Sequence, residues 1–373
     1  MPRQFPAVLA VGVAGAVALA ACAGDSDDAT GTSQGGGAVA GASAGRIGVI
    51  LPDSATSARW ETADRPFLEN AFKRAGIEYD IQNAQGDKAR FQAIADGMIS
   101  SGVKVLLITN LDSETGAAVI KRATGVGVPV IDYDRLTLGG GAKYYVSFDN
   151  VAVGATIGQG LVSCLKAAHV TSGGVVELNG SPDDNNATLF KQGYDKVIKG
   201  AGHDVVADEA VPNWNNTIAG LMFEQTLTSQ RGKFVAVAAA NDGLAGAVVA
   251  VLQRNGLAGK IPVSGQDATD EGLQRILLGT QCNTVYKAVK KEADAASKLA
   301  IAVATGDTAS ATELAGDVSL DIETGLAVKS VLLQPQGITR KNVKDVIADG
   351  YTTKEKVCTT PELQAACTAA GIS

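Results

Sequence analysis

Short apolar runs alternate with longer amphipathic stretches along most of the chain. The runs are rich in Val, Ile and aromatic residues, which is typical of buried β-strands, and the stretches repeat apolar positions with helical spacing. The predicted strands are 46–51, 78–81, 103–109, 128–134, 143–149, 173–179, 203–209, 234–240, 261–265 and 283–287. The predicted helices lie near 59–75, 88–101, 113–126, 150–168, 185–200, 215–229, 243–255, 269–278 and 340–349.

Continuous apolar strands joined by helices indicate parallel sheets that are covered on both faces. The segment 46–373 is longer than a single hydrophobic core usually supports. The pattern therefore predicts an α/β fold with two lobes, each built on an open parallel sheet.

The N-terminus has a different pattern. After Arg3, an apolar run over 7–21 ends in small residues, which is typical of a secretory signal peptide. The run is shorter than the roughly 20 residues that a membrane-spanning helix needs. We therefore predict a signal peptide over 1–21. The letters LAAC at its end resemble the lipobox of bacterial lipoproteins, which makes Cys22 the predicted site of lipidation.

The segment 22–45 consists mainly of Gly, Ala, Ser, Thr and Asp. This composition buries too little apolar surface to offset the entropy of an ordered chain. We expect a flexible tether that links lipidated Cys22, at the outer face of the cell membrane, to the globular part.

Charge and histidine content exclude several classes of function. The chain has 32 Lys and Arg against 39 Asp and Glu, a formal net charge of -7, and no basic run, so a nucleic-acid surface is not expected. His169 and His203 stand far apart without Cys or carboxylates at metal-ligand spacing. We expect no metal and no cofactor.

The cysteines after Cys22 form an even set of four. In an exported protein such a set favours disulfides over metal binding. Cys358 and Cys367 are predicted to pair because they lie close together in a polar tail. Cys164 and Cys282 would form the second pair, which requires the helix 150–168 to lie beside the strand 283–287.

Polar segments follow several of the predicted strands, where ligands bind in open α/β sheets. They read PDSATSARW, YDR, NGSPDDNNA, ND and QD. None contains a nucleophile elbow, a P-loop, a dinucleotide fingerprint or a zinc motif. Polar groups without a catalytic set predict a binding cleft.

The residue types in these segments suit a monosaccharide, which offers a ring of hydroxyls and apolar C–H faces. Trp60 and Trp214 follow strand-end loops in opposite halves of the chain and are expected to form two walls of one cleft. Arg135 can donate two parallel hydrogen bonds, whereas Asp184 and Asp267 only accept. The alternatives are core positions for the tryptophans and surface ion pairs for the charges.

Seven motifs, in this order, resemble the xylose-binding members of the type 1 periplasmic sugar-binding proteins. They are SARW, VIDYDR, YYVSFDN, NGSPDDNNATLFKQGY, AANDGLAGA, VSGQDA and GTQCNTVYK. The resemblance implies two Rossmann-like lobes joined by three hinge strands, a bound monosaccharide, foremost D-xylose, and delivery to an ABC permease. It carries the sugar contacts to Trp60, Asp134, Arg135, Asp184, Asn186, Trp214, Asn241, Asp267 and Lys287.

The same resemblance gives the expected domain boundaries. Lobe 1 is expected at 46–147 and 288–318, and lobe 2 at 148–287 and 319–335. A tail over 336–373 has no assigned role. We expect a monomer that works by closing its lobes around the sugar.

Three alternatives are weighed against this reading. The effector-binding core of a transcription regulator shares the fold, but it needs a helix-turn-helix in place of a signal peptide. An exported glycosidase needs two carboxylates flanking the scissile bond, whereas Asp183 and Asp184 are adjacent in sequence. Among binders, glucose, galactose, arabinose or a furanosyl signalling molecule stay open, as does service to a sensory receptor.

Overall fold

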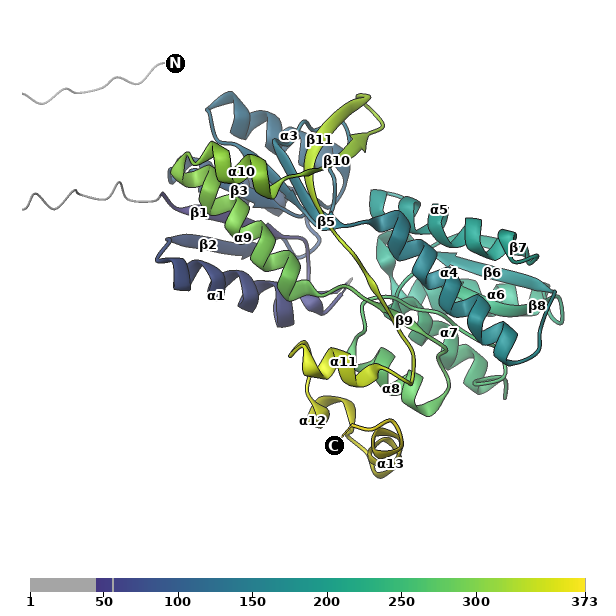
Figure 1. Ribbon diagram of the computed structural model, residues 1–373. Coiled ribbons are helices and arrows are strands. Elements are labelled where there is room, and N and C mark those ends of the chain that lie inside the picture. Colours follow the sequence, from purple (N-terminus) through teal and green to yellow (C-terminus); the bar gives the residue numbers. More distant parts are fainter. Residues whose placement is uncertain (1–44, 56, 373) are drawn as a thin grey trace, which may run out of the picture. The chain divides into compact units, whose positions relative to one another are not determined.

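The computed structural model describes residues 45–55 and 57–372 (Figure 1). The predicted signal peptide over 1–21, the lipidation site Cys22 and the tether, apart from Gly45, lie outside these residues. Within the described residues, no helix combines the length and the hydrophobicity that crossing a membrane requires.

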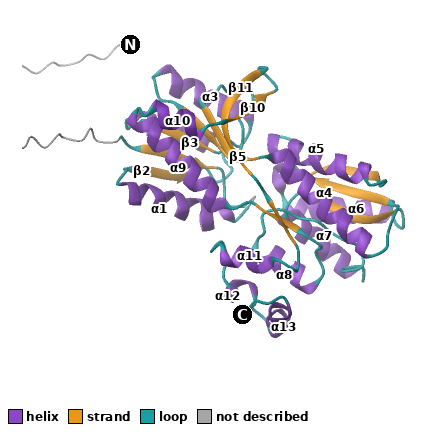
Figure 2. Ribbon diagram, in the orientation of Figure 1, coloured by secondary structure: helices purple, strands orange, loops and turns teal. Residues whose placement is uncertain are grey.

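The first lobe is built on a sheet of seven strands in the order β10-β11-β5-β4-β3-β1-β2. Figure 2 draws the strands of this sheet in orange, near the helices α1, α3, α9 and α10. All neighbouring pairs are parallel except β10 with β11. The strands are β1 (Ile47–Leu51), β2 (Tyr79–Asn83), β3 (Val105–Ile108), β4 (Val130–Tyr133), β5 (Tyr144–Phe148), β10 (Asp317–Asp321) and β11 (Leu326–Leu333).

Alternate side chains of the central strands face two different helical layers. In β1, Val49 and Leu51 belong to one apolar cluster and Ile50 to another. Residues of η1 (Trp60–Asp64), α1 (Arg65–Ala75), α9 (Val289–Thr305) and α10 (Thr308–Leu314) join the first cluster. Residues of α2 (Lys88–Ser100) and α3 (Ser113–Gly125) join the second. The sheet is thus buried on both faces, as the continuous apolar strands predicted.

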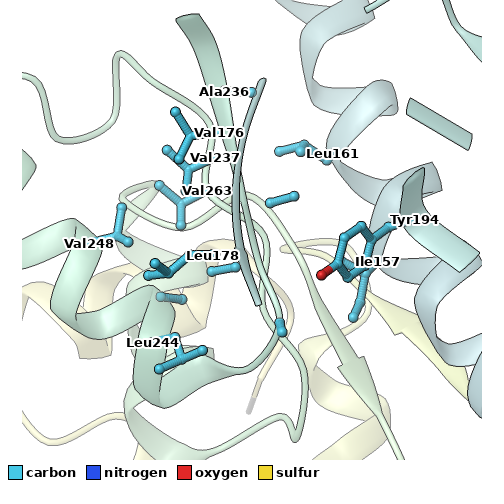
Figure 3. Packing of buried hydrophobic residues seen from close by; sticks show 14 of the residues in the cluster. Ile157, Leu161, Val176, Leu178, Tyr194, Ala236, Val237, Leu244, Val248 and Val263 are labelled. Carbon is cyan, nitrogen blue, oxygen red and sulfur yellow. The ribbon is translucent and has the colours of Figure 1, made fainter. Parts of the chain in front are cut away.

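The second lobe is built on three parallel strands in the order β7-β6-β8. Figure 3 shows Ile157, Leu161 and Tyr194 on one side of these strands and Leu244 and Val248 on the other. The predicted strand 261–265 is reduced to one bridge between Val263 and Val237. The elements are α4 (Asn150–Ala167), β6 (Gly174–Asn179), α5 (Asn185–Gly200), β7 (Asp204–Ala210), η2 (Pro212–Trp214), α6 (Asn216–Ser229), β8 (Phe234–Ala239), α7 (Asp242–Arg254) and α8 (Asp270–Leu278).

Two glycines let α4 and α5 approach closely. A Cβ atom at Gly154 would lie 2.0 Å from the carbonyl oxygen of Phe190, and one at Gly193 would lie 2.3 Å from that of Val151. Because no larger residue fits at either position, the contact fixes α5 against α4. The first turn of α5 carries Asn186, so this contact also fixes part of the candidate site.

The chain passes between the two sheets three times. It leaves the first sheet after β5, returns after β9 (Thr284–Tyr286), and leaves again towards β12 (Gln336–Ile338), which pairs with β9. The expected boundary that assigned 319–335 to lobe 2 is wrong for β10 and β11, because β11 pairs in parallel with β5 and β10 pairs with β11. A strand has the same apolar pattern whichever of the two sheets it joins, so the sequence of β10 and β11 does not show which sheet contains them.

Two disulfides are present among the described residues. The structure pairs Cys164 with Cys282 and Cys358 with Cys367, the two pairs named from the sequence. Cys164 lies on α4 and Cys282 lies just before β9, so the first bond joins this helix to the strand that links the lobes. The second bond lies in the C-terminal segment, which contains β12, α11 (Val343–Ala348), α12 (Lys354–Val357) and α13 (Pro361–Ala369).

Candidate ligand-binding site

All nine residues singled out from the sequence line one pocket at the carboxyl ends of the strands. The empty space between its side chains is about 350 Å³, including the part that opens to solvent. All nine residues are buried. Four further residues line the pocket: Ser57, Arg59, Phe190 and Gln266. Sequence reasoning missed Arg59 although it stands next to Trp60 in the quoted SARW motif.

Arg59 organises the charges on the first-lobe wall. Its Nε and Nη2 atoms lie 2.9 and 2.8 Å from the two carboxylate oxygens of Asp64. Its Nη1 lies 3.0 Å from Oδ2 of Asp134, and Nη2 lies 2.8 Å from Oε2 of Glu292. Burial disfavours the guanidinium charge, but the charges of Asp64 and Asp134 outweigh burial and raise the pKa of Arg59 well above its usual value.

Asp134 is the carboxylate on which the cations converge. Its Oδ2 lies 3.0 Å from Arg59 and 3.1 Å from Nζ of Lys287. Burial acts to raise the pKa of Asp134, but Lys287, Arg59 and Arg135 hold it below the usual range, so the carboxyl is ionised. Its φ of 64° is uncommon for a residue other than glycine. This backbone turn presents its carbonyl oxygen to Nδ2 of Asn186 at 2.9 Å.

Glu292 balances the charge of this network by staying protonated. Burial, and then the charge of Asp134, raise the pKa of Glu292 to about 8. Its Oε2 accepts from Arg59, whereas Oε1 has no hydrogen-bond partner among the described residues. With Glu292 neutral, Asp64 and Asp134 balance the positive charges of Arg59 and Lys287.

The second-lobe wall is held by helix caps. Asp184 caps α5, because its Oδ1 accepts from the backbone N–H of Asn186 at 2.9 Å. Its Oδ2 accepts from Nε1 of Trp214 at 3.1 Å and lies 3.0 Å from Nε of Arg135. Asn241 caps α7 in the same way, through the backbone N–H of residue 244 at 2.8 Å. Capping therefore fixes both side chains at the edge of the pocket.

The two tryptophans are held by their neighbours. The guanidinium carbons of Arg59 and Arg135 lie 4.4 and 5.7 Å from the Trp60 ring centroid. Trp214 lies against Gly180, where a Cβ atom would be 2.1 Å from the ring. Nε1 of Trp60 is buried and has no hydrogen-bond partner within the described part of the chain. This donor belongs to a residue that lines the pocket and is therefore available to a ligand oxygen.

Asp267 occupies strained backbone. Its φ is 101°, and that of the following Ala268 is 51°, in the region that favours glycine. The N–H of Asp267 donates to the carbonyl of Val285 at 2.9 Å. Its carboxylate accepts from Gln266 and, at 3.4 Å, from Ser57 of the first lobe. This carboxylate therefore reaches the pocket from the second lobe and meets the first.

The site offers hydrogen-bond acceptors, donors and two aromatic rings, which suits a small molecule with several hydroxyl groups. In the part of the chain that the structure describes, no group of three His, Cys, Asp or Glu residues is arranged to hold a metal ion. Because most of the charges are already paired within the protein, the pocket favours a neutral ligand.

Comparison with known proteins identifies the family. Residues 47–308 of the chain match the protein family described as the periplasmic binding protein domain. The chain belongs to this family. This periplasmic binding protein is 35% identical over 312 residues to the D-xylose-binding periplasmic protein of Escherichia coli K12, covering 82% of the chain and 90% of that relative. It is 33% identical over 318 residues to the D-xylose-binding periplasmic protein of Haemophilus influenzae, with 84% and 92% covered.

Solved structures agree with the fold. A solute-binding protein of an ABC transporter from Clostridium phytofermentans, with β-D-glucose bound, has a TM-score of 0.72 at 27% identity and covers 84% of this chain and 99% of its own. One from Chloroflexus aurantiacus, in complex with D-glucose, has a TM-score of 0.73 at 27% identity, with 83% and 97% covered. The predicted α/β architecture is confirmed, and the family is one of binding proteins rather than enzymes.

Proposed function

We propose that the protein is the solute-binding lipoprotein of an ABC importer that captures D-xylose between its lobes. The main observation behind the proposal is that all nine residues predicted from the sequence are buried and line one pocket. The two D-xylose-binding relatives, each above 30% identity over most of the chain, favour this pentose among the sugars.

The chemistry of the pocket supports a sugar ring. Trp60 Nε1 is a donor without a partner among the described residues, so it can donate to a hydroxyl oxygen, and the Arg135 guanidinium lines the same pocket with several N–H donors. Asp267 and Asp184 can accept from hydroxyl groups, and charge-assisted bonds of this kind contribute about 1.5–3 kcal/mol each. Trp60 and Trp214 provide surfaces for the apolar faces of the ring.

Lobe closure is the proposed mechanism. Trp60, Asp134 and Arg135 come from the first lobe, whereas Asp184 and Trp214 come from the second, so neither lobe surrounds the ligand alone. A ligand that contacts both walls binds the closed form more tightly and shifts the protein towards it. We expect saturating sugar to lower the radius of gyration in small-angle scattering, and no compaction would contradict this mechanism.

Anchoring and partners complete the proposal. The LAAC sequence supports lipidation of Cys22 on the outer face of the membrane, and the segment up to 45 would act as a tether. The closed protein, as a monomer, would deliver its sugar to permease subunits of the importer. Mass spectrometry of the membrane-extracted protein tests the anchor, because the mature chain should begin at an acylated Cys22.

D-Glucose is the second candidate, because both compared structures contain it. The pyranose rings differ only by the hydroxymethyl group at C5, so a thermal-shift and calorimetric comparison separates the two. A ligand at 100 times its dissociation constant stabilises the protein by about 2.7 kcal/mol. We expect D-xylose to bind more tightly than D-glucose. Equal or tighter binding of glucose would make the hexose the better assignment.

A further inference from the structure

The C-terminal residues 336–372, here named the appendage, share a small hydrophobic cluster with α8 and with residues beside β9. Apolar residues of α11, α12 and α13 belong to one buried cluster with residues of α8. In Figure 1 the appendage, coloured yellow, lies beside α8. Cys358 and Cys367 are both buried in this cluster, and their disulfide joins the end of α12 to α13.

The cluster includes sequence neighbours of two residues that line the pocket, Asp267 and Lys287. Ala268, which follows Asp267, is fully buried in it. Tyr286 and Ala288, which stand on either side of Lys287, also belong to it. The appendage therefore shares a hydrophobic cluster with the neighbours of both residues, and through β12 and Asp349 it contacts Tyr286, which precedes Lys287.

Polar contacts strengthen the same attachment. The hydroxyl of Tyr286 donates to Oδ2 of Asp349 at 2.7 Å, and its ring centroid lies 5.3 Å from that of Tyr351. Thr352 donates to Asp270 at the start of α8. Burial, and then the charge of Asp267, raise the pKa of Tyr351 well above its usual value. The phenol of Tyr351 therefore lies close enough to interact electrostatically with the Asp267 carboxylate.

The backbone at Asp267 and Ala268 has an unfavourable conformation that the surrounding structure must hold in place. Two consecutive residues other than glycine have φ values of 101° and 51°, and such conformations persist only where the surroundings enforce them. On the inner side, the N–H of Asp267 bonds to the carbonyl of Val285, and that of Ala268 bonds to Thr284 Oγ1 at 3.2 Å. The side chain of Ala268 is fully buried in the cluster that α8 and the appendage share.

We infer that the appendage is a positioning element of the ligand site, which holds Asp267 and Lys287 in their binding geometry and depends on the Cys358–Cys367 bond. The inference rests on the proposed function, because it concerns the affinity of the same pocket. The appendage touches no ligand, so it acts through the backbone that it covers.

The first test removes the disulfide in the full chain with the double substitution Cys358→Ser and Cys367→Ser. Relaxation of one strained residue corresponds to roughly a five- to hundredfold loss of D-xylose affinity. We expect this loss in calorimetry, mainly as faster dissociation in stopped-flow tryptophan fluorescence, with a retained circular dichroism spectrum. Wild-type affinity and dissociation rate in the double variant would overturn the inference.

A second test avoids any change in the disulfide. Asp349→Ala removes the acceptor of the Tyr286 hydroxyl, whereas Asp349→Asn keeps an acceptor oxygen. The matched control is Asp345→Ala on α11, whose carboxylate accepts from Gln336 within the appendage itself. We expect Asp349→Ala to weaken D-xylose binding roughly two- to tenfold, with Asp349→Asn and Asp345→Ala close to wild type.

The outcomes separate the two proposals. A wild-type protein that binds neither D-xylose nor D-glucose contradicts the proposed function. A wild-type protein that binds sugar, with equal affinities in Asp349→Ala and Asp345→Ala, contradicts the positioning role and leaves the function intact. If the double cysteine variant fails to fold, this aspartate pair decides the question by itself.

Discussion

The two walls of the pocket are organised by different physics. On the first-lobe wall, Asp134 is held by ion pairs, with Arg59 and Lys287 within 3.1 Å of one oxygen. On the second-lobe wall, Asp184 and Asn241 are held by backbone N–H groups at helix starts. One wall therefore depends on a balance of buried charges, and the other on local backbone geometry.

This difference determines how each wall should respond to mutation. Removing one charge from a buried network leaves its partners uncompensated, so the damage spreads to the stability of the lobe. Removing a side chain from a cap or a loop mainly affects the ligand and one helix end, since the backbone keeps its other hydrogen bonds. Changes to the first wall should therefore lower stability, and changes to the second should lower affinity.

The largest effect is expected from Arg59→Met. The substitution leaves Asp64 and Asp134 without their shared cation in a buried position, which costs about 3–5 kcal/mol of unfolding free energy. Arg74→Met is the control, because its ion pair with Asp294 at 3.5 Å is largely exposed and should contribute less than about 1 kcal/mol. Urea denaturation measures both. Equal losses of unfolding free energy in the two variants would contradict the conclusion that buried ion pairs stabilise the first-lobe wall.

Asp267→Ala tests the second wall. The loss of this acceptor removes a charge-assisted hydrogen bond to the bound sugar and leaves the Ser57 hydroxyl and the Gln266 amide without their acceptor, at a cost of about 2–4 kcal/mol in binding, or roughly 30- to 1000-fold in affinity. Calorimetry with D-xylose measures the loss, and the unfolding temperature without sugar should change little. Asp204→Ala, at the exposed start of β7, serves as the control. Near-wild-type binding by Asp267→Ala would remove this residue from the site.

Gly180→Ala sharpens the role of Trp214. The new Cβ atom would meet the indole ring at 2.1 Å, so the ring must move and the wall changes shape. Overpacking of this kind costs about 1–3 kcal/mol, and we expect it to appear as weaker D-xylose binding. Gly220→Ala on α6 is the control, because its Cβ atom would have an ordinary contact at 3.9 Å. If both variants bind alike, the position of the Trp214 ring does not matter for the ligand.

The smallest effect on D-xylose affinity is expected from Glu292→Gln, because at neutral pH the native carboxyl is uncharged like glutamine, whereas the effect on stability depends on pH. The folded protein keeps this proton up to about pH 8, whereas the unfolded chain releases it near pH 4.5. The folded state thus binds more protons between these values, so this group makes the unfolding free energy fall as the pH rises from 5 to 8.

Glutamine cannot release a proton, so Glu292→Gln should remove this part of the decrease. Urea denaturation at several pH values measures the slope. Glu313→Gln is the control, because Glu313 is an exposed residue on α10. This variant should keep the wild-type dependence of the unfolding free energy on pH. A wild-type slope in Glu292→Gln would mean that the carboxyl is ionised in the folded protein.

The sequence predicts the strand-end site better than the network behind it. Asp134 follows β4 and Asn241 follows β8, and ligands of open α/β sheets bind at the carboxyl ends of the strands, so the place of both residues at the site follows from the pattern. The pairing of Arg59 with Glu292 joins residues 233 positions apart and depends on how α9 returns to the first sheet. No local pattern carries that information.

The fold shows the same limit. Strands with continuous apolar residues, such as β1, β3 and β8, are recognised because burial on both faces leaves no polar alternation. The helix α9 has no counterpart among the predicted elements: its core face is largely alanine, as at Ala293 and Ala300, which gives little contrast with its outer face. The sheet that β11 joins is decided by long-range pairing with β5, which its residues do not encode locally.

The pairing of β11 with β5 has a consequence for biogenesis. The strand that completes the first sheet beside β5 ends at Leu333, so a ribosome must translate nearly the whole message before that sheet can close. Until then β5, made long before, has a free edge on that side. For a chain predicted to be secreted, late completion of the first lobe leaves the nascent polypeptide unfolded for longer, in the state that a translocation channel accepts.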